Sequence, residues 1–294
     1  QQYDVPMLEA NFVTLEQGTG IVHCAPSHGP DDFNLCLKHG IKALDTIDDD
    51  GRYTKHIKKF EGIHIFKADQ IVIQNLKECK KLLANGKLTH SYPHSWRSKA
   101  PLVHRATSQW FISMEEKDLR KKALKAIDNT DFYPERGRDR IRSMIETRPD
   151  WCVSRQRIWG VPLPLFVSKK TKEPLKDPEV IENIAKIFEK QGADCWFTDD
   201  PQKFLGKKYK KEDYIKTNDI VEVWFDSGST HSFVLEKRKD LKWPADMYLE
   251  GSDQHRGWFH SSLLESCGTR GRAPFESILS HGVVVDGKGL KMSK

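Results

Sequence analysis

One stretch of the chain, residues 245–259 with sequence ADMYLEGSDQHRGWF, brings together side chains that could bind a small polar ligand. Residues 247–249 predict a short buried strand, and apolar residues at helical spacing after position 258 predict a helix. A strand, a glycine-containing turn and a helix N-terminus leave bare backbone that a ligand can approach. The strand and the helix would therefore present the residues of the turn to a ligand.

The side chains of this turn suit a ligand that carries an amine, a sugar and an apolar group. Glu250 can hold an ammonium group, and Gly251 lets the backbone come close to the ligand. Asp253 can accept two hydroxyl hydrogen bonds, as a ribose diol would offer, and Trp258 can form the wall of an apolar pocket. The alternative is a structural turn in which a serine or aspartate caps the helix, and this stretch alone leaves both interpretations open.

A second motif, Lys291-Met292-Ser293-Lys294, follows the glycine-rich loop at 286–289. Two lysines on a flexible loop can reach phosphate groups while negative charge develops on them. The motif is weak by itself. Combined with a preceding strand–turn–helix that suits a sugar and an amine, it predicts a nucleotide site.

Four segments together resemble the isoleucyl-tRNA synthetases, which are class I aminoacyl-tRNA synthetases of the Ile/Val/Leu group, here of the bacterial or organellar type. The resemblance covers nearly the whole chain, and residues 251–259 are its most specific part because valyl and leucyl relatives differ there. A valyl-tRNA synthetase is one alternative. A free-standing editing hydrolase or nucleotide-binding module is another, against which the lysine motif argues. The four segments are 150–162, 223–229, 250–259 and 281–294.

The resemblance implies a role for each residue of an activation site. Glu250 would hold the substrate ammonium, while Trp224, Trp258 and Gln254 would contact the amino acid. Lys291 and Lys294 would be catalytic, by neutralising phosphate charge in the transition state. Isoleucine, ATP with Mg²⁺ as substrate, and tRNA(Ile) are the implied partners, without a dedicated metal site or structural zinc. The implied ATP site consists of Gly251, Asp253, Gln254, His281, Gly282, Lys291 and Lys294.

Residues 23–32 crowd two histidines and two aspartates into one polar loop. From the residues alone this could be a metal site, a catalytic loop or a solvated loop, although its spacing does not fit a common zinc pattern. The resemblance implies an editing site, in which Asp32 holds the α-amino group of a mischarged aminoacyl end and His23 lies beside its side chain. Ser27 and Pro30 depart from the Gly and Gln common in bacterial relatives.

The predicted fold class is α/β: part of a Rossmann-like parallel-sheet catalytic domain, with the later part of an inserted mixed α/β editing domain. We expect an internal fragment that lacks the His-x-Gly-His element and the Thr-rich editing segment. Such a fragment should be inactive alone and aggregate through an exposed sheet edge. The predicted parts are the editing domain at 1–90, a return segment at 91–164, a Lys-rich insertion at 165–217 and the later catalytic half at 218–294.

Local patterns predict the remaining elements. Five arginines between positions 136 and 148 indicate either a solvated face or phosphate contacts, and the sequence leaves this open. Helices are predicted at 32–38, 69–83 and 115–127 and after an Asp-Pro cap at 177–178; strands are predicted at 92–97, 103–111 and 220–225, the last followed by a turn at 226–229.

Composition agrees with a globular protein: 37% of residues are hydrophobic and 31% are charged. No apolar run approaches the ~20 residues that a membrane-spanning helix needs, and we expect a cytoplasmic protein without a membrane partner. The six cysteines lack Cys-x-x-Cys spacing, which favours reduced thiols over a zinc ribbon or a disulfide framework. The net charge of +6 permits a nucleic-acid partner without demonstrating one.

Overall fold

The computed structural model describes residues 4–16 and 18–292. The chain divides into two compact units, Gln1–Ser108 and Gln109–Lys294, and each is described separately below. In the described residues, no helix is long and apolar enough to cross a membrane.

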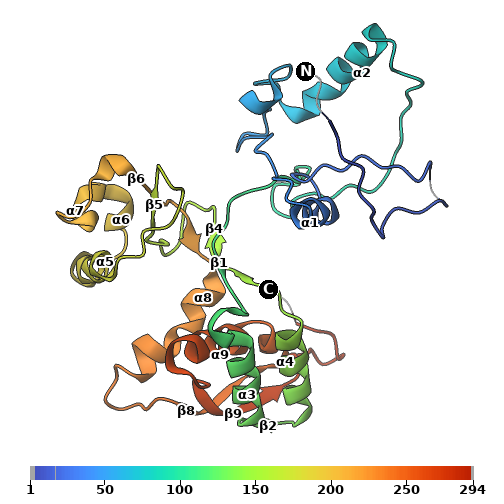
Figure 1. The fold of residues 1–294 in the computed structure, drawn as a ribbon. Coiled ribbons are helices and arrows are strands. Elements are labelled where there is room, and N and C mark those ends of the chain that lie inside the picture. The colour runs from blue at the N-terminus through green and yellow to red at the C-terminus, as the bar shows by residue number, and fades with distance from the viewer. Residues whose placement is uncertain (1–3, 17, 293–294) are drawn as a thin grey trace. The chain divides into compact units, whose positions relative to one another are not determined.

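The unit from Gln109 onward is built on a three-stranded parallel sheet (Figure 1). Its strands are β2 (Asp131–Tyr133), β9 (Phe275–His281) and β8 (Ala245–Gly251), in the order β2–β9–β8. Both neighbouring pairs are parallel, and the predicted parallel α/β architecture is confirmed to this extent. Strand β8, the helix after it and β9 form a β–α–β unit, because parallel neighbours need a crossover connection.

Three helices pack against this sheet: α3 (Leu119–Asp128, preceded by a 3₁₀ turn at Glu116–Asp118), α4 (Arg136–Glu146) and α9 (Trp258–Arg270) (Figure 1). The apolar residues that predicted helix α9 are all buried in the core. The core also takes in Tyr248 from β8 and Ile278 from β9. The four predicted apolar positions of α9 are Phe259, Leu263, Leu264 and Cys267.

Short antiparallel ladders lie outside the parallel sheet. Strand β1 (Phe111–Ile112) pairs with β3 (Trp151–Cys152), and β4 (Ser154–Arg155) pairs with β7 (Ile220–Val221). The predicted strand at 220–225 is therefore wrong beyond Val221, and the predicted turn at 226–229 is largely helical. Helix α8 (Val223–Gly228) begins there because Glu222 caps it, accepting the backbone N–H of Trp224 at 3.1 Å. A single π-helical turn, η5 (His231–Leu235), follows.

The Lys-rich segment after residue 165 has a hydrophobic core of its own around the fully buried Trp196. Asp177 caps its main helix by accepting the N–H of Glu179 at 2.9 Å, and Val180 and Ile184 are buried as predicted. Its elements are β5 (Phe166–Ser168), α5 (Pro178–Gln191), α6 (Cys195–Thr198), α7 (Pro201–Leu205), a 3₁₀ turn at Lys211–Asp213 and β6 (Tyr214–Lys216).

The unit up to Ser108 contains two helices, α1 (Pro30–Lys38) and α2 (Ala68–Glu78), and 3₁₀ turns at Lys55–Ile57 and Ile65–Lys67. Helix α1 agrees closely with the prediction. Helix α2 ends at Glu78, earlier than predicted, because Lys80 takes a left-handed conformation with φ 55° and Leu83 is fully exposed. The predicted strands at 92–97 and 103–111 are also wrong in the described residues, where only an isolated bridge between His94 and Pro101 and the first residue of β1 form.

Candidate functional site

The carboxyl ends of β8 and β9 lie side by side and carry several of the predicted site residues. Glu250 is opposite Ser280, and Gly251 is opposite His281, in the parallel register. Ligands bind beyond the carboxyl ends of strands in open α/β sheets. The 3₁₀ turn Ser252–His255 follows directly and leads into α9. The sheet thus brings the residues of the predicted turn to the same edge as His281.

Gly251 is required by close packing at this edge. A Cβ atom added to Gly251 would lie 2.6 Å from Oδ1 of Asp253 and 3.7 Å from Cε1 of His281. The first distance is shorter than real Cβ contacts, so any other residue at 251 would displace the Asp253 side chain. The Asp253 carboxylate therefore lies directly beside bare backbone, as a site for hydroxyl groups would require.

Gln254 has a structural role that the sequence did not reveal. Its side-chain oxygen accepts the backbone N–H of Trp258 at 3.0 Å, and its nitrogen donates to Oδ2 of Asp253 at 3.1 Å. Gln254 thus provides an acceptor for a backbone N–H in the first turn of α9 and also orients the Asp253 carboxylate. The predicted contact of Gln254 with a substrate stays a prediction.

The two tryptophans predicted to form the pocket flank the N-terminus of α9. The Trp258 indole stacks on the Tyr248 ring, with centroids 4.2 Å apart and planes at 10°. Trp224, on α8, is 41% exposed, and its Cη2 atom would lie 2.9 Å from a Cβ on Gly257. Glycine at 257 therefore allows the Trp224 ring to pack against the start of α9.

The remaining predicted residues of this site are exposed. Glu250 is the penultimate residue of β8 and is exposed, and Gly282 follows β9. Lys291 pairs with Val285 across a turn in which the Asp286 carboxylate accepts backbone N–H groups. Within the described part of the chain, no hydrogen bond or ion pair joins Lys291 to the sheet edge, and Lys294 lies outside the described residues.

Glu222, which the sequence did not indicate as a site residue, is buried beside this site. Its Oε1 accepts the indole N–H of Trp151 at 3.0 Å, and its Oε2 accepts the N–H of Trp224 at 3.1 Å. The guanidinium of Arg155 lies 3.9 Å from the same carboxylate. Glutamate is not among the residues preferred at helix N-caps, and the apolar run around it predicted a continuous strand.

A carboxyl group on α9 is held protonated at neutral pH. Burial, with the carboxylates of Asp226 and Glu222, raises the pKa of Glu265 to about 9. Burial, with Glu222, also raises the pKa of Asp226. Glu265 Oε1 lies 2.1 Å from where a Cβ on Gly228 would be, so α8 and α9 approach closely at this point.

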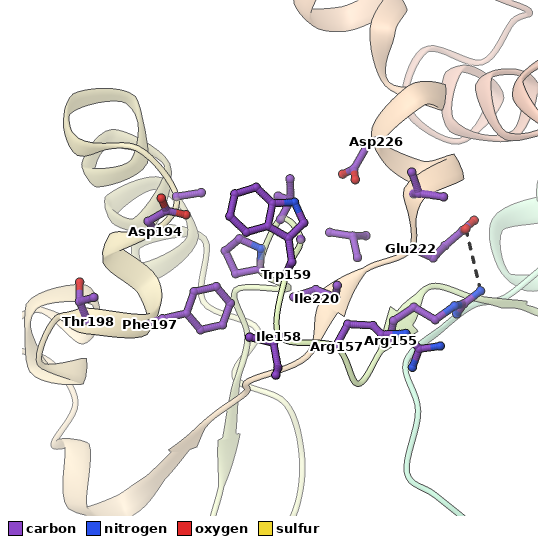
Figure 2. Close-up of a pocket in the computed structure, with 16 residues that line it drawn as sticks. Arg155, Arg157, Ile158, Trp159, Asp194, Phe197, Thr198, Ile220, Glu222 and Asp226 are labelled. Atoms are coloured by element: carbon purple, nitrogen blue, oxygen red, sulfur yellow. Dashed lines mark ion pairs between the residues drawn. The ribbon is translucent and has the colours of Figure 1, made fainter. Parts of the chain in front are cut away.

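A cavity of about 760 Å³ opens beside the same carboxylates, between the residue 155–162 segment and the Lys-rich insertion (Figure 2). Figure 2 shows Asp194, Phe197 and Thr198 on one wall and Glu222 and Asp226 on the other. The side chains of Ile158 and Trp159 are almost fully exposed, which leaves an apolar surface between these walls.

The predicted editing residues lie in the other unit. Asp32 Oδ2 accepts the backbone N–H of Ala25 at 2.7 Å, and His23 is exposed. The His28 ring lies between the carbonyl oxygen of His104 and the Thr46 hydroxyl, each at 2.8 Å. Because a carbonyl only accepts, Nδ1 of His28 carries the hydrogen. A cavity of about 350 Å³ includes His28 in its lining but neither His23 nor Asp32.

Three of the five clustered arginines have partners within the protein. Arg142 forms ion pairs with Asp128 and Glu146, and Arg138 donates to the carbonyl oxygen of Thr130 at 3.1 Å. The guanidinium of Arg148 lies over the Trp151 ring, 5.5 Å from its centroid. These contacts favour a structural role for at least this part of the cluster.

Among the residues that the structure describes, no group of His, Cys, Asp and Glu side chains could hold a metal ion. Residues 16–294 match the family described as tRNA synthetases class I (I, L, M and V). The chain is 79% identical over 292 residues to an isoleucine–tRNA ligase of Pelagibacter ubique, covering 99% of this chain and 32% of that protein.

Two further isoleucine–tRNA ligases are similar, from Gluconobacter oxydans at 53% identity and from Caulobacter vibrioides at 51%. These matches cover 100% and 99% of this chain. The chain spans about a third of the length of these relatives, 32% in each case. With this match over nearly its whole length, the chain belongs to the class I tRNA synthetases of the isoleucine, leucine, methionine and valine group.

Proposed function

We propose that the chain is the part of an isoleucine-activating, ATP-dependent aminoacyl-tRNA synthetase that carries the later half of its activation site. One observation carries the proposal: Glu250, Gly251, Asp253 and His281 meet at one edge of a parallel sheet. The names of the similar proteins, all isoleucine–tRNA ligases, support isoleucine as the amino acid.

The proposed reaction has two steps. The carboxylate of isoleucine attacks the α-phosphorus of ATP, which forms isoleucyl-adenylate and releases pyrophosphate with its bound Mg²⁺. A hydroxyl of the terminal ribose of tRNA(Ile) then attacks the acyl carbon, and AMP leaves. Neither step needs covalent chemistry from the protein, so positioning and charge stabilisation dominate. We assign the reaction to the cytoplasm.

Different residues at the sheet edge bind different parts of isoleucine and ATP. Glu250 binds the isoleucine ammonium, and the Trp224 and Trp258 rings enclose its side chain. Asp253, oriented by Gln254, accepts the ribose hydroxyls at the bare backbone of Gly251. His281 and Gly282 flank the nucleotide, while Lys291 and Lys294 neutralise phosphate charge as pyrophosphate leaves.

The unit up to Ser108 is proposed to contribute to an editing site. One methylene in an apolar pocket is worth only about 1–3 kcal/mol, and the isoleucine–valine pair in this class of enzyme is the standard illustration of that limit. Hydrolysis of mischarged valyl-tRNA then restores accuracy. Asp32 holds the α-amino group with the carboxylate oxygen that is not bonded to Ala25, and His23 lies beside the amino-acid side chain.

Pyrophosphate exchange tests the proposal in a chimeric ligase, in which residues 1–294 replace the matching third of the Pelagibacter ubique protein. We expect exchange to depend on isoleucine and to be much weaker with valine or leucine. A preference for valine would identify a valyl-tRNA synthetase instead. Absence of exchange together with hydrolysis of valyl-tRNA would identify an editing hydrolase.

A further inference from the structure

The buried carboxylate of Glu222 joins two parts of the fold that are distant in sequence. Its Oε1 accepts the indole N–H of Trp151 at 3.0 Å, from strand β3. Its Oε2 accepts the backbone N–H of Trp224 at 3.1 Å, from the first turn of α8. The Glu222 backbone N–H also donates to the carbonyl oxygen of Val153 at 2.8 Å. The start of α8 is thus tied to the strands at 151–155 by side chain and backbone.

Positive charge near this carboxylate partly compensates its negative charge. The guanidinium of Arg155 approaches to 3.9 Å, and Figure 2 marks this ion pair. A buried carboxylate is costly unless it is hydrogen-bonded, so its two N–H donors and Arg155 must keep their places around it. The geometry of the first turn of α8 is correspondingly fixed.

This turn carries Trp224. The ring is 41% exposed and packs against Gly257 at the start of α9. We propose that Glu222 is a positioning residue for amino-acid binding: it holds the start of α8 against Trp151, and so sets where the Trp224 ring meets the substrate side chain. This inference rests on the proposed function of the sheet edge as an isoleucine-activating site.

Loss of the Glu222 contacts should affect the binding of isoleucine but not that of ATP. Asp253 and His281, which are proposed to bind the nucleotide, are held by Gln254 and by the β8–β9 pairing, not by Glu222. Loss of the Glu222 contacts therefore weakens isoleucine binding more than ATP binding. A residue that only stabilised the fold would move both Michaelis constants together.

The test measures the KM for isoleucine and the KM for ATP by pyrophosphate exchange in the chimeric ligase. Glu222→Gln keeps the size of the side chain but turns one acceptor into a donor that faces an N–H group. We expect the KM for isoleucine to rise about tenfold, while the KM for ATP changes by less than about twofold. Glu222→Asp keeps the negative charge, and its KM for isoleucine should rise less than that of Glu222→Gln.

A second variant tests the same hydrogen bond from its donor. Trp151→Phe removes the indole N–H that Glu222 accepts, together with part of the ring volume, and should raise the KM for isoleucine about threefold. The matched control is Trp196→Phe, which removes the N–H that a fully buried tryptophan donates to the carbonyl oxygen of Thr217 at 2.8 Å, in the core of the insertion. This control should leave both Michaelis constants within about twofold of the unsubstituted values.

Three results would overturn the inference. One is an unchanged KM for isoleucine in both Glu222→Gln and Trp151→Phe. Another is an equal rise in the two Michaelis constants. The third is a Trp196→Phe effect as large as that of Trp151→Phe. Failure of the proposed function is distinguishable, because the unsubstituted chimera would then show no isoleucine-dependent exchange at all.

Discussion

The turn at 250–258, in the proposed activation site, and the editing-like loop at 23–32 are held in different ways. The turn is built into a core: Trp258 stacks on the buried Tyr248, and Gln254 caps the buried helix α9. The loop is held by hydrogen bonds: Asp32 accepts the N–H of Ala25, and His28 contacts the His104 carbonyl and the Thr46 hydroxyl. The first region gains its geometry from packing, and the second gains it from a few hydrogen bonds.

This difference predicts how the two regions respond to substitution. In the proposed activation site, side chains that we propose bind the substrate adjoin side chains that form the core, so that small changes in volume should disturb binding. In the loop, His23 is exposed and Asp32 partly so, and changes there should act locally. The four substitutions below test this contrast in the chimeric ligase or in the chain itself.

The largest effect is expected from Glu250→Gln, which removes the charge that would face the substrate ammonium. Loss of one partner of such a pair should reduce kcat/KM for isoleucine by the equivalent of about 2–5 kcal/mol. Pyrophosphate exchange measures kcat/KM for isoleucine. Deacylation of valyl-tRNA, which depends on the editing-like loop, is the internal control and should not change. An unchanged kcat/KM for isoleucine would remove Glu250 from the site.

A similar but smaller loss is expected from Gly257→Ala, which tests packing instead of charge. The added Cβ would lie 2.6 Å from Gln254 Oε1 and 2.9 Å from the Trp224 ring, so both groups must move. A misplacement of about 1 Å can cost about a hundredfold in rate. We therefore expect isoleucine-dependent exchange to fall by about that factor.

The matched control for this substitution is Gly268→Ala in the same helix. A Cβ at Gly268 would meet only Leu119 Cδ1, at an ordinary 3.6 Å, and alanine favours the helix by roughly 0.5–1 kcal/mol. This variant should exchange pyrophosphate normally and unfold at a slightly higher temperature. If both alanine variants behave alike, packing at Gly257 is not what positions Trp224.

The contrast also explains what the sequence could predict. Apolar periodicity predicted α9 because Phe259, Leu263 and Cys267 are all in the core, and Asp-Pro predicted the start of α5 because capping is a local interaction. Residues 220–225 were assigned to a strand, since the hydrophobicity pattern of a short buried run does not distinguish a strand from a helical turn. The Glu222 side chain caps the helical turn, so that α8 forms after Val221 instead of a longer strand.

The sequence predicted the polar residues of the proposed site. It did not predict the contacts that hold these residues in place. Glu250, Gly251 and Asp253 are adjacent in sequence, so a turn brings them together. Their relation to His281 depends on the β8–β9 register, which only the folded sheet provides. The Trp151–Glu222 hydrogen bond joins residues that are far apart in the chain, and no local pattern indicates such a contact.

Asp32→Ala in the editing-like loop should affect deacylation of valyl-tRNA alone. Loss of the carboxylate should slow deacylation of valyl-tRNA about tenfold or more, because an ammonium group loses its partner, while isoleucine activation is spared. Asp32→Asn is the matched control, since its side-chain oxygen can still accept the Ala25 N–H. Equal deacylation rates in Asp32→Ala and the unsubstituted chimera would contradict the editing assignment.

The smallest effect should come from Glu265→Gln, and it concerns stability instead of turnover. Burial, Asp226 and Glu222 raise the pKa of Glu265 from 4.5 to about 9, so the folded chain keeps a proton that the unfolded chain releases. The stabilising contribution is complete below pH 4.5 and is lost as pH rises toward 9. Glutamine cannot titrate, and the variant should therefore gain stability relative to the unsubstituted chain as pH increases.

Urea unfolding of the 294-residue chain at pH 5 and pH 8 measures this gain, which should be on the order of 2 kcal/mol larger at the higher pH. The control is Glu276→Gln, which removes an exposed carboxylate paired with Arg272 instead of a buried one. A gain that is the same at both pH values would mean that Glu265 ionises freely. The packing of α8 on α9, which holds Trp224 against Gly257, would then be looser than the close approach of Glu265 to Gly228 implies.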